Sequence, residues 1–105
     1  MHRFEVRYTA AAREDLLRLF DFLLDKAQTA EDCDAAQYVI RCLRDDIENH
    51  LSRAPFVYRK AGTSPFLRET VIAFGHTGYV ALYEIEGKAH VNILAIRHQR
   101  EDDYH

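Results

Sequence analysis

Apolar and polar residues alternate at the start of the chain, where Phe4, Val6 and Tyr8 are separated by charged residues. A period of two is typical of a strand with one buried face. From residue 10 the apolar spacing changes to three or four, which predicts a helix over residues 10–27 with Thr9 as its N-cap. A stripe this broad suits a helix that packs against two neighbours. It comprises Ala12, Leu16, Leu19, Phe20, Leu23 and Ala27, widened by Leu17 and Leu24.

The stretch QTAEDCDAA, residues 28–36, interrupts this pattern and offers Thr29 or Asp32 as the N-cap of a second helix. That helix is expected to end before Pro55, because proline disfavours helical geometry in the residue before it. A short link joins the two helices, so they are expected to form an antiparallel hairpin. The apolar positions of the second helix are Ala36, Val39, Ile40, Leu43, Ile47 and Leu51.

Residues 55–65, PFVYRKAGTSP, are loop-like, and three β-rich runs follow them. The runs FLRETVIAF, YVALYEI and AHVNILAIR are separated by turns that contain glycine, which predicts a three-stranded antiparallel meander. A sheet of this size needs a cover in water, so the helical hairpin is expected to pack on one of its faces. The predicted fold class is α+β in the order β-α-α-β-β-β, as a single domain over residues 1–105.

The composition is that of an ordinary soluble globular domain, with 48% hydrophobic and 30% charged residues. No apolar run is long enough for a membrane span and no signal-peptide core precedes the first strand, so the expected location is the cytoplasm. The formal net charge of −3 argues against a generic nucleic-acid binder. Acids outnumber bases in residues 10–53 and bases outnumber acids in residues 54–100. This split either lets one face meet an acidic partner or gives two ordinarily solvated faces.

Metal and cofactor chemistry is not indicated. Cys33 and Cys42 fall on opposite sides of the second helix, so they are expected to stay reduced. The six histidines lack the close pairing of a zinc site. The chain has no phosphate-binding glycine loop and no serine in a nucleophile elbow. We therefore predict no metal and no cofactor.

The last strand runs directly into the sequence RHQREDDYH, residues 97–105. His98 is a candidate general acid or base, Arg97 and Arg100 could hold a phosphate, and Tyr104 could stack on a base. The acids at positions 101–103 would repel a phosphate. The alternative is that these charged residues only keep the end of the last strand soluble.

Further bases lie near the start of the meander. Arg68 is in its first strand, and Arg59 and Lys60 are in the loop before it. Together with Arg97 and Arg100 they could form one basic edge of the sheet, if the topology brings them together.

Three stretches resemble a known family: Leu67-Arg68-Glu69, the run YVALY at residues 79–83, and AIRHQRE at residues 95–101. They are similar to the RelE/ParE superfamily of toxins from bacterial type II toxin–antitoxin modules, and to its ParE, or plasmid-stabilisation, branch. The resemblance covers nearly the whole chain. It implies a small sheet backed by a helical hairpin, which agrees with the periodicity.

The resemblance also implies two alternative targets. Ribosome-dependent ribonucleases of the superfamily place cations near the positions of Val71, Ala73 and Val80, which are apolar here. Without such cations phosphoryl transfer loses its main electrostatic stabilisation, so the ParE branch is favoured, whose members bind and inhibit DNA gyrase. The alternative is an endoribonuclease that acts on mRNA at the ribosome. It would use Arg68, Arg97, His98 and Tyr104.

A cognate antitoxin is the partner that the resemblance implies, in a toxin–antitoxin hetero-oligomer without membrane involvement. A third alternative is a chain that has kept antitoxin binding but lost toxicity. We expect an amphipathic antitoxin segment to wrap the helical hairpin and the sheet edge, with its acids towards Arg97 and Arg100. The residues predicted to contact the antitoxin or the target are Leu17, Phe22, Leu24, Arg68, Arg97, His98 and Arg100.

Overall fold

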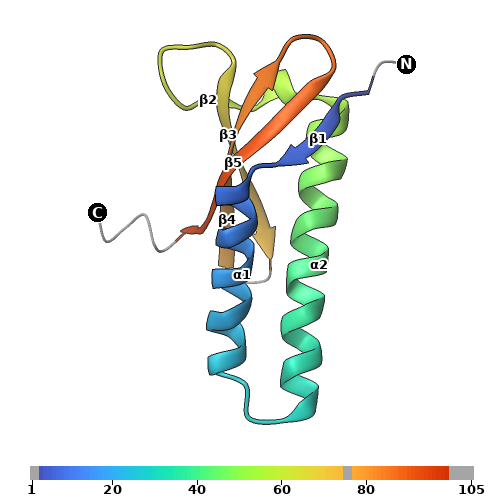
Figure 1. The fold of residues 1–105 in the computed structure, drawn as a ribbon, viewed down its shortest axis with the longest axis vertical. Helices are drawn as coiled ribbons and strands as arrows, with labels where there is room; N and C mark the ends of the chain where they lie inside the picture. Colours follow the sequence, from blue (N-terminus) through green and yellow to red (C-terminus); the bar gives the residue numbers. More distant parts are fainter. Residues whose placement is uncertain (1–2, 75–76, 100–105) are drawn as a thin grey trace.

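The computed structural model describes residues 3–74 and 77–99. In that part of the chain a helical hairpin packs against a five-stranded sheet with the order β1-β5-β4-β3-β2 (Figure 1). The predicted α+β fold and its β-α-α-β-β-β order are confirmed, with one short strand added. The elements are β1 (Glu5–Tyr8), α1 (Ala10–Asp25), α2 (Ala30–Arg53), the 3₁₀ helix η1 (Pro55–Val57), β2 (Arg59–Lys60), β3 (Leu67–Phe74), β4 (Thr77–Glu86) and β5 (His90–His98).

The helix ends follow local capping chemistry. The Thr9 hydroxyl accepts a hydrogen bond from the N–H of Ala12, as predicted. Thr29 caps α2 by accepting from the N–H of Asp32, whose carboxylate accepts in turn from the N–H of Gln28. Both predicted cap candidates of α2 therefore take part in one reciprocal motif.

The three long strands form the predicted antiparallel meander, with one irregularity between Leu82 and Tyr83 where β4 meets β5. β1 adds to β5 in parallel orientation, so the N-terminal strand becomes one edge of the sheet. The stretch 55–65, predicted to be a loop, contains η1 and β2, and β2 pairs with the start of β3. A two-residue strand is too short to leave a period in the sequence, which explains why the pattern did not predict it.

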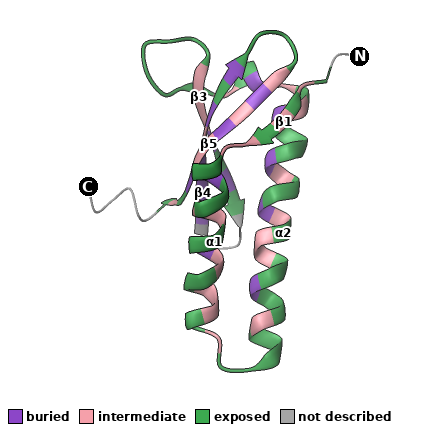
Figure 2. Cartoon of the chain, in the orientation of Figure 1, coloured by how far each residue is buried: buried purple, intermediate pink, exposed green. Residues whose placement is uncertain are grey.

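The core lies between the helices and one face of the sheet (Figure 2). On β4 the residues of this core are Tyr79, Ala81, Tyr83 and Ile85, which alternate with residues of the opposite face, where Val80 is also buried. They pack with buried residues of both helices and of β5. The face of the sheet that points away from the helices is called the open face below. The helix and β5 residues of this core are Ala12, Leu19, Leu43, Ile47, Leu51, Val91, Ile93 and Ile96.

Two glycines satisfy specific conformational needs. Gly87, in the turn between β4 and β5, has a φ of 62°, which favours a residue without a Cβ atom. A Cβ atom on Gly78 would overlap the side-chain oxygen of Gln99, so a larger residue there would require the end of the Gln99 side chain to move.

Cys33 and Cys42 are free thiols, as predicted. Neither α1 nor α2 has an apolar stretch that could cross a bilayer, within the residues that the structure describes.

Candidate functional site

A groove of about 840 Å³ runs between α1 and α2. Leu16, Leu17 and Phe20 line it from α1, and Ile40 lines it from α2. Leu17 is 62% exposed, which is unusual for a leucine on a broad apolar stripe. The remaining lining residues are Tyr8, Arg13, Gln37, Arg41, Arg44, Asp45 and Glu48.

Tyr8 lines the groove from the end of β1. Its hydroxyl donates a hydrogen bond to the backbone oxygen of Arg44 at 3.4 Å, and the Arg44 guanidinium lies 5.6 Å from its ring centroid. Burial, and then the nearby Glu48 carboxylate, raise the pKa of Tyr8 to about 12. The phenol is therefore neutral at physiological pH and remains a hydrogen-bond donor.

Three arginines give the groove a cationic lining: Arg13, Arg41 and Arg44 are all exposed. The sequence pattern did not predict these three arginines as site residues. A signal was present, because Gln37, Arg41 and Arg44 recur at helical spacing and mark one polar flank of α2. Which flank faces the other helix depends on how the hairpin packs, so the spacing alone did not identify the groove.

The three hydrophobic contact residues predicted on the first helix do not share one surface. Leu17 lines the groove, and Leu24 follows two turns later on the same side of α1 and is half-buried. Phe22 is 53% exposed on another side of the helix, where the Nζ atom of Lys26 lies 4.4 Å from its ring centroid. The structure therefore groups Leu17 with Leu24 and sets Phe22 apart.

Arg97 and His98 are consecutive on β5, so their side chains point to opposite faces of the sheet. Arg97 is exposed and pairs with Val80. His98 is half-buried and pairs with Tyr79 of the core, and the two rings meet nearly edge to face with 5.3 Å between their centroids. The predicted Arg100 and Tyr104 lie outside the described residues.

Arg68 is engaged within the protein. Its guanidinium donates to the backbone oxygens of Phe56 at 2.8 Å, Tyr58 at 2.7 Å and Pro65 at 2.7 Å. It also lies 5.4 Å from the ring centroid of Phe56. Arg68 thereby ties the segment between α2 and β3 to the sheet.

The predicted basic edge is not assembled as one surface. Arg68 lies opposite Tyr83 and Arg97 lies opposite Val80. Tyr83 and Val80 are three residues apart on β4, so the two arginines point to opposite faces. Arg59 forms an ion pair with Glu69 at 2.5 Å.

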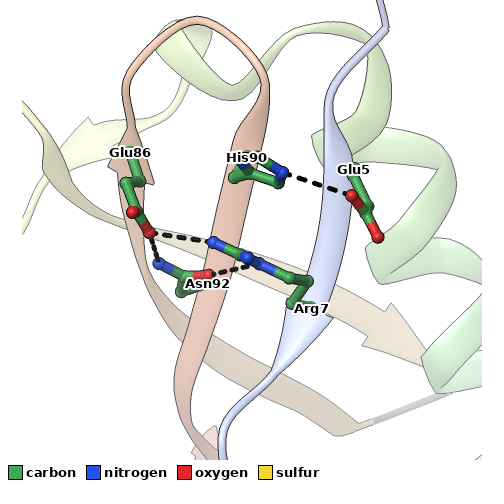
Figure 3. Close-up of polar contacts among 5 residues, drawn as sticks. All are labelled: Glu5, Arg7, Glu86, His90 and Asn92. Carbon is green, nitrogen blue, oxygen red and sulfur yellow. Dashed lines mark hydrogen bonds and ion pairs between the residues drawn. The ribbon is translucent and has the colours of Figure 1, made fainter.

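The open face carries two adjacent valines beside Arg97, and a separate polar cluster. Val71 pairs with Val80, and Val80 pairs with Arg97, so the three residues form a row across β3, β4 and β5. Two of the three positions where the ribonuclease branch has cations, Val71 and Val80, are therefore adjacent and apolar, and Arg97 lies beside Val80. The polar cluster lies towards the other end of β4 and comprises Glu5, Arg7, Glu86, His90 and Asn92 (Figure 3).

In the polar cluster, Arg7 contacts Glu86 at 2.9 Å and donates to the side-chain oxygen of Asn92 at 3.0 Å. The Asn92 amide donates to the same Glu86 carboxylate at 2.7 Å. That hydrogen bond, and then the charge of Arg7, lower the pKa of Glu86. His90 lies 3.2 Å from Glu5. These contacts join β1, β5 and β4, and within residues 3–74 and 77–99 no group of acids, histidines and cysteines is arranged to hold a metal ion.

The family model described as “ParE toxin of type II toxin-antitoxin system, parDE” matches residues 6–103 of this sequence. The chain belongs to the ParE toxin family. A solved structure described as “Chromosomal ParDE TA system from P. aeruginosa” has a similar fold, with a TM-score of 0.70 and 16% sequence identity. The similarity covers 93% of this chain and 98% of that chain. No curated protein matches the sequence.

The ParE match spans all three stretches on which the resemblance rested, residues 67–69, 79–83 and 95–101. Recognition of the ParE branch from those stretches is therefore confirmed. In this ParE-family toxin the first two stretches lie on β3 and β4, and the last begins on β5.

Proposed function

We propose that this ParE-family toxin inhibits DNA gyrase by binding to it, and that a cognate antitoxin neutralises it within a toxin–antitoxin complex in the cytoplasm.

The observation that carries the gyrase proposal is the arrangement of the residues that an endoribonuclease would need. Phosphoryl transfer requires cations organised around one phosphate. Arg68 donates to three backbone oxygens, and Arg97 and His98 point to opposite faces. Val71 and Val80 lie side by side on the open face. This arrangement supports inhibition by binding over RNA cleavage.

The groove between α1 and α2 supports the antitoxin part of the proposal. It combines an apolar lining, including the exposed Leu17, with the arginines Arg13, Arg41 and Arg44. An amphipathic segment with apolar anchors and acidic neighbours would complement both features. The arginines that line the groove therefore take the role that the sequence suggested for Arg97 and Arg100.

The deciding experiment separates the two targets. The toxin is induced in cells, and DNA breaks and mRNA cleavage are measured separately, while the purified protein is added to a gyrase supercoiling assay. We expect DNA damage, intact transcripts and inhibited supercoiling, all relieved by co-expression of the antitoxin from the neighbouring gene. Codon-linked transcript cuts with normal supercoiling would instead establish the endoribonuclease.

A further inference from the structure

One edge of the sheet is only partly covered. β4 pairs with β3 along the whole of β3, from Leu67 to Phe74. On the other side, β2 pairs only with Arg68 and Glu69. Among the described residues, no strand lies beside β3 after Glu69.

The direction of the hydrogen bonds identifies the uncovered backbone groups. The N–H of Ile85 donates to the oxygen of Phe66 at 2.8 Å, so even-numbered positions here bond towards β4. The oxygen of Leu67 accepts instead from the N–H of Ala61 at 2.9 Å, on the side of β2. Because the register of β3 and β4 has no shift, Val71 and Ala73 also direct their N–H and C=O groups away from β4. The unpaired edge of β3 beside Val71 and Ala73 is called the uncovered lane below.

At the opposite edge of the sheet, side chains bond to the backbone groups that no strand covers. Beyond the end of β1, the Asp15 carboxylate accepts the N–H of Ile96 at 2.9 Å, and the Arg18 guanidinium donates to the oxygen of Ile96 at 3.5 Å. Side chains of α1 thus close that edge, as proteins commonly do to prevent unwanted pairing. No such contact closes the lane beside Val71 and Ala73 in the described part of the chain.

The lane is bordered by α2. Cys42, Asp46 and His50 follow one another at four-residue spacing on the flank of α2 opposite the arginine-lined groove. The His50 ring lies 6.0 Å from the ring of Tyr58, the residue before β2, so the His50 end of this flank lies next to the edge strand β2. An added strand would therefore place alternate side chains against α2 and beside the 41% exposed Val71.

We propose that an extended segment of the antitoxin adds to the sheet in this lane and hydrogen-bonds to the backbone of Val71 and Ala73. The inference rests on the proposed neutralisation by an antitoxin. The outward N–H and C=O groups of Val71 and Ala73 can hydrogen-bond to the backbone of an added strand of any sequence. A lane this short offers too little contact area for a stable pairing of two toxin copies. If the same antitoxin chain also occupies the groove between α1 and α2, the added strand gives it a second contact with the toxin.

The test uses Val71→Pro, with Val71→Thr as its matched control. Proline removes the outward N–H and fills the lane with its ring, but breaks no bond to β4, and edge positions of this kind tolerate proline. Threonine keeps the N–H and the branched shape. We expect Val71→Pro to weaken binding of the purified antitoxin by about tenfold or more, since one lost hydrogen bond and a clash are involved. Val71→Thr should change affinity by less than about twofold.

Amide hydrogen exchange on the unmodified toxin provides a readout that does not depend on the folding of a variant. Exchange of the Val71 and Ala73 amides should slow when antitoxin is added, whereas these amides should exchange freely in the toxin alone. Equal affinities for the two variants together with unchanged exchange would overturn the inference. Protection that rises with the concentration of toxin alone would assign the lane to a second copy, and would also overturn it. Absence of any antitoxin binding to the unmodified toxin would instead refute the proposed neutralisation.

Discussion

The carboxylate of Asp15 accepts a hydrogen bond from the backbone N–H of Ile96, with 2.9 Å between Oδ2 and N. Asp15 lies on α1 and Ile96 lies on β5, far apart in the sequence. Because β1 ends at Tyr8, Ile96 has no strand on that side and would otherwise leave its N–H without a partner. A helical side chain therefore completes the hydrogen bonding of the sheet edge.

Asp15→Ala is expected to lower the free energy of unfolding by about 1–3 kcal/mol, the usual cost of an unsatisfied partly buried donor. Asp15→Asn keeps an acceptor oxygen and should lose less. Urea denaturation at neutral pH measures both changes. Asp21→Ala, an exposed position on the same helix, is the matched control and should change stability by less than about 0.5 kcal/mol. Equal losses at positions 15 and 21 would contradict this role.

Arg68→Lys is expected to destabilise the fold by about 1–3 kcal/mol, because an ammonium group cannot reproduce the planar fork that contacts three carbonyl oxygens. The segment between α2 and β3 should also become more sensitive to proteolysis. Thermal denaturation and limited proteolysis measure the two effects, with Arg97→Lys as the control. A stable Arg68→Lys protein with reduced toxicity would show instead that Arg68 contacts the target.

The stability of the protein should depend on Tyr8 at alkaline pH. The raised pKa of Tyr8, to about 12 from an ordinary value of 10.0, means that the folded state favours the neutral phenol. Its contribution is therefore fully present below pH 10 and is lost as the pH rises towards 12. The free energy of unfolding should fall more steeply over this range in the wild type than in Tyr8→Phe. Part of the decrease should remain in Tyr8→Phe, because burial also raises the pKa of Tyr83. Parallel curves for the two proteins would contradict the prediction.

Reversing the charge of the groove should weaken antitoxin binding. We expect the double variant Arg41→Glu/Arg44→Glu to lower affinity by about tenfold at low salt, and by less at high salt because exposed charges are screened. Arg97→Glu, on the open face, is the control. Titration calorimetry at two salt concentrations makes the comparison. A larger loss for Arg97→Glu would place the acidic part of the antitoxin at the end of β5, as the sequence suggested.

His98 distinguishes binding from catalysis. In a gyrase-binding toxin its role is limited to contacts such as that with Tyr79, so His98→Gln should remain toxic when strongly expressed. Loss of an acid or base in a ribonuclease would cost about 10²–10⁴ in rate. Growth after induction is the measurement. Removal of residues 97–105 should weaken toxicity more than the point substitution, because it removes surface as well. A folded His98→Gln protein that still binds antitoxin but is harmless would favour the enzyme.

Features that depend on local interactions could be predicted from the sequence alone. Thr9 and Thr29 cap helices through hydrogen bonds to residues three positions later. The helix α2 ends at Arg53, because Pro55 disfavours helical geometry in the residue before it. The alternation of Phe4, Val6 and Tyr8 with charged residues likewise predicted the first strand, β1. Each of these signals lies within a few residues of its effect, so no knowledge of packing was needed.

The tertiary structure decided which of the candidate site residues share a surface. The opposite orientations of Arg68 and Arg97 follow from strand register, which joins positions far apart in the chain. The arginine-lined groove arises only when one flank of α2 turns towards α1. The uncovered lane beside Val71 and Ala73 exists because β2 ends after two residues. These features result from pairing and packing between distant segments, and the free energy of those contacts is not encoded in any local pattern of the sequence.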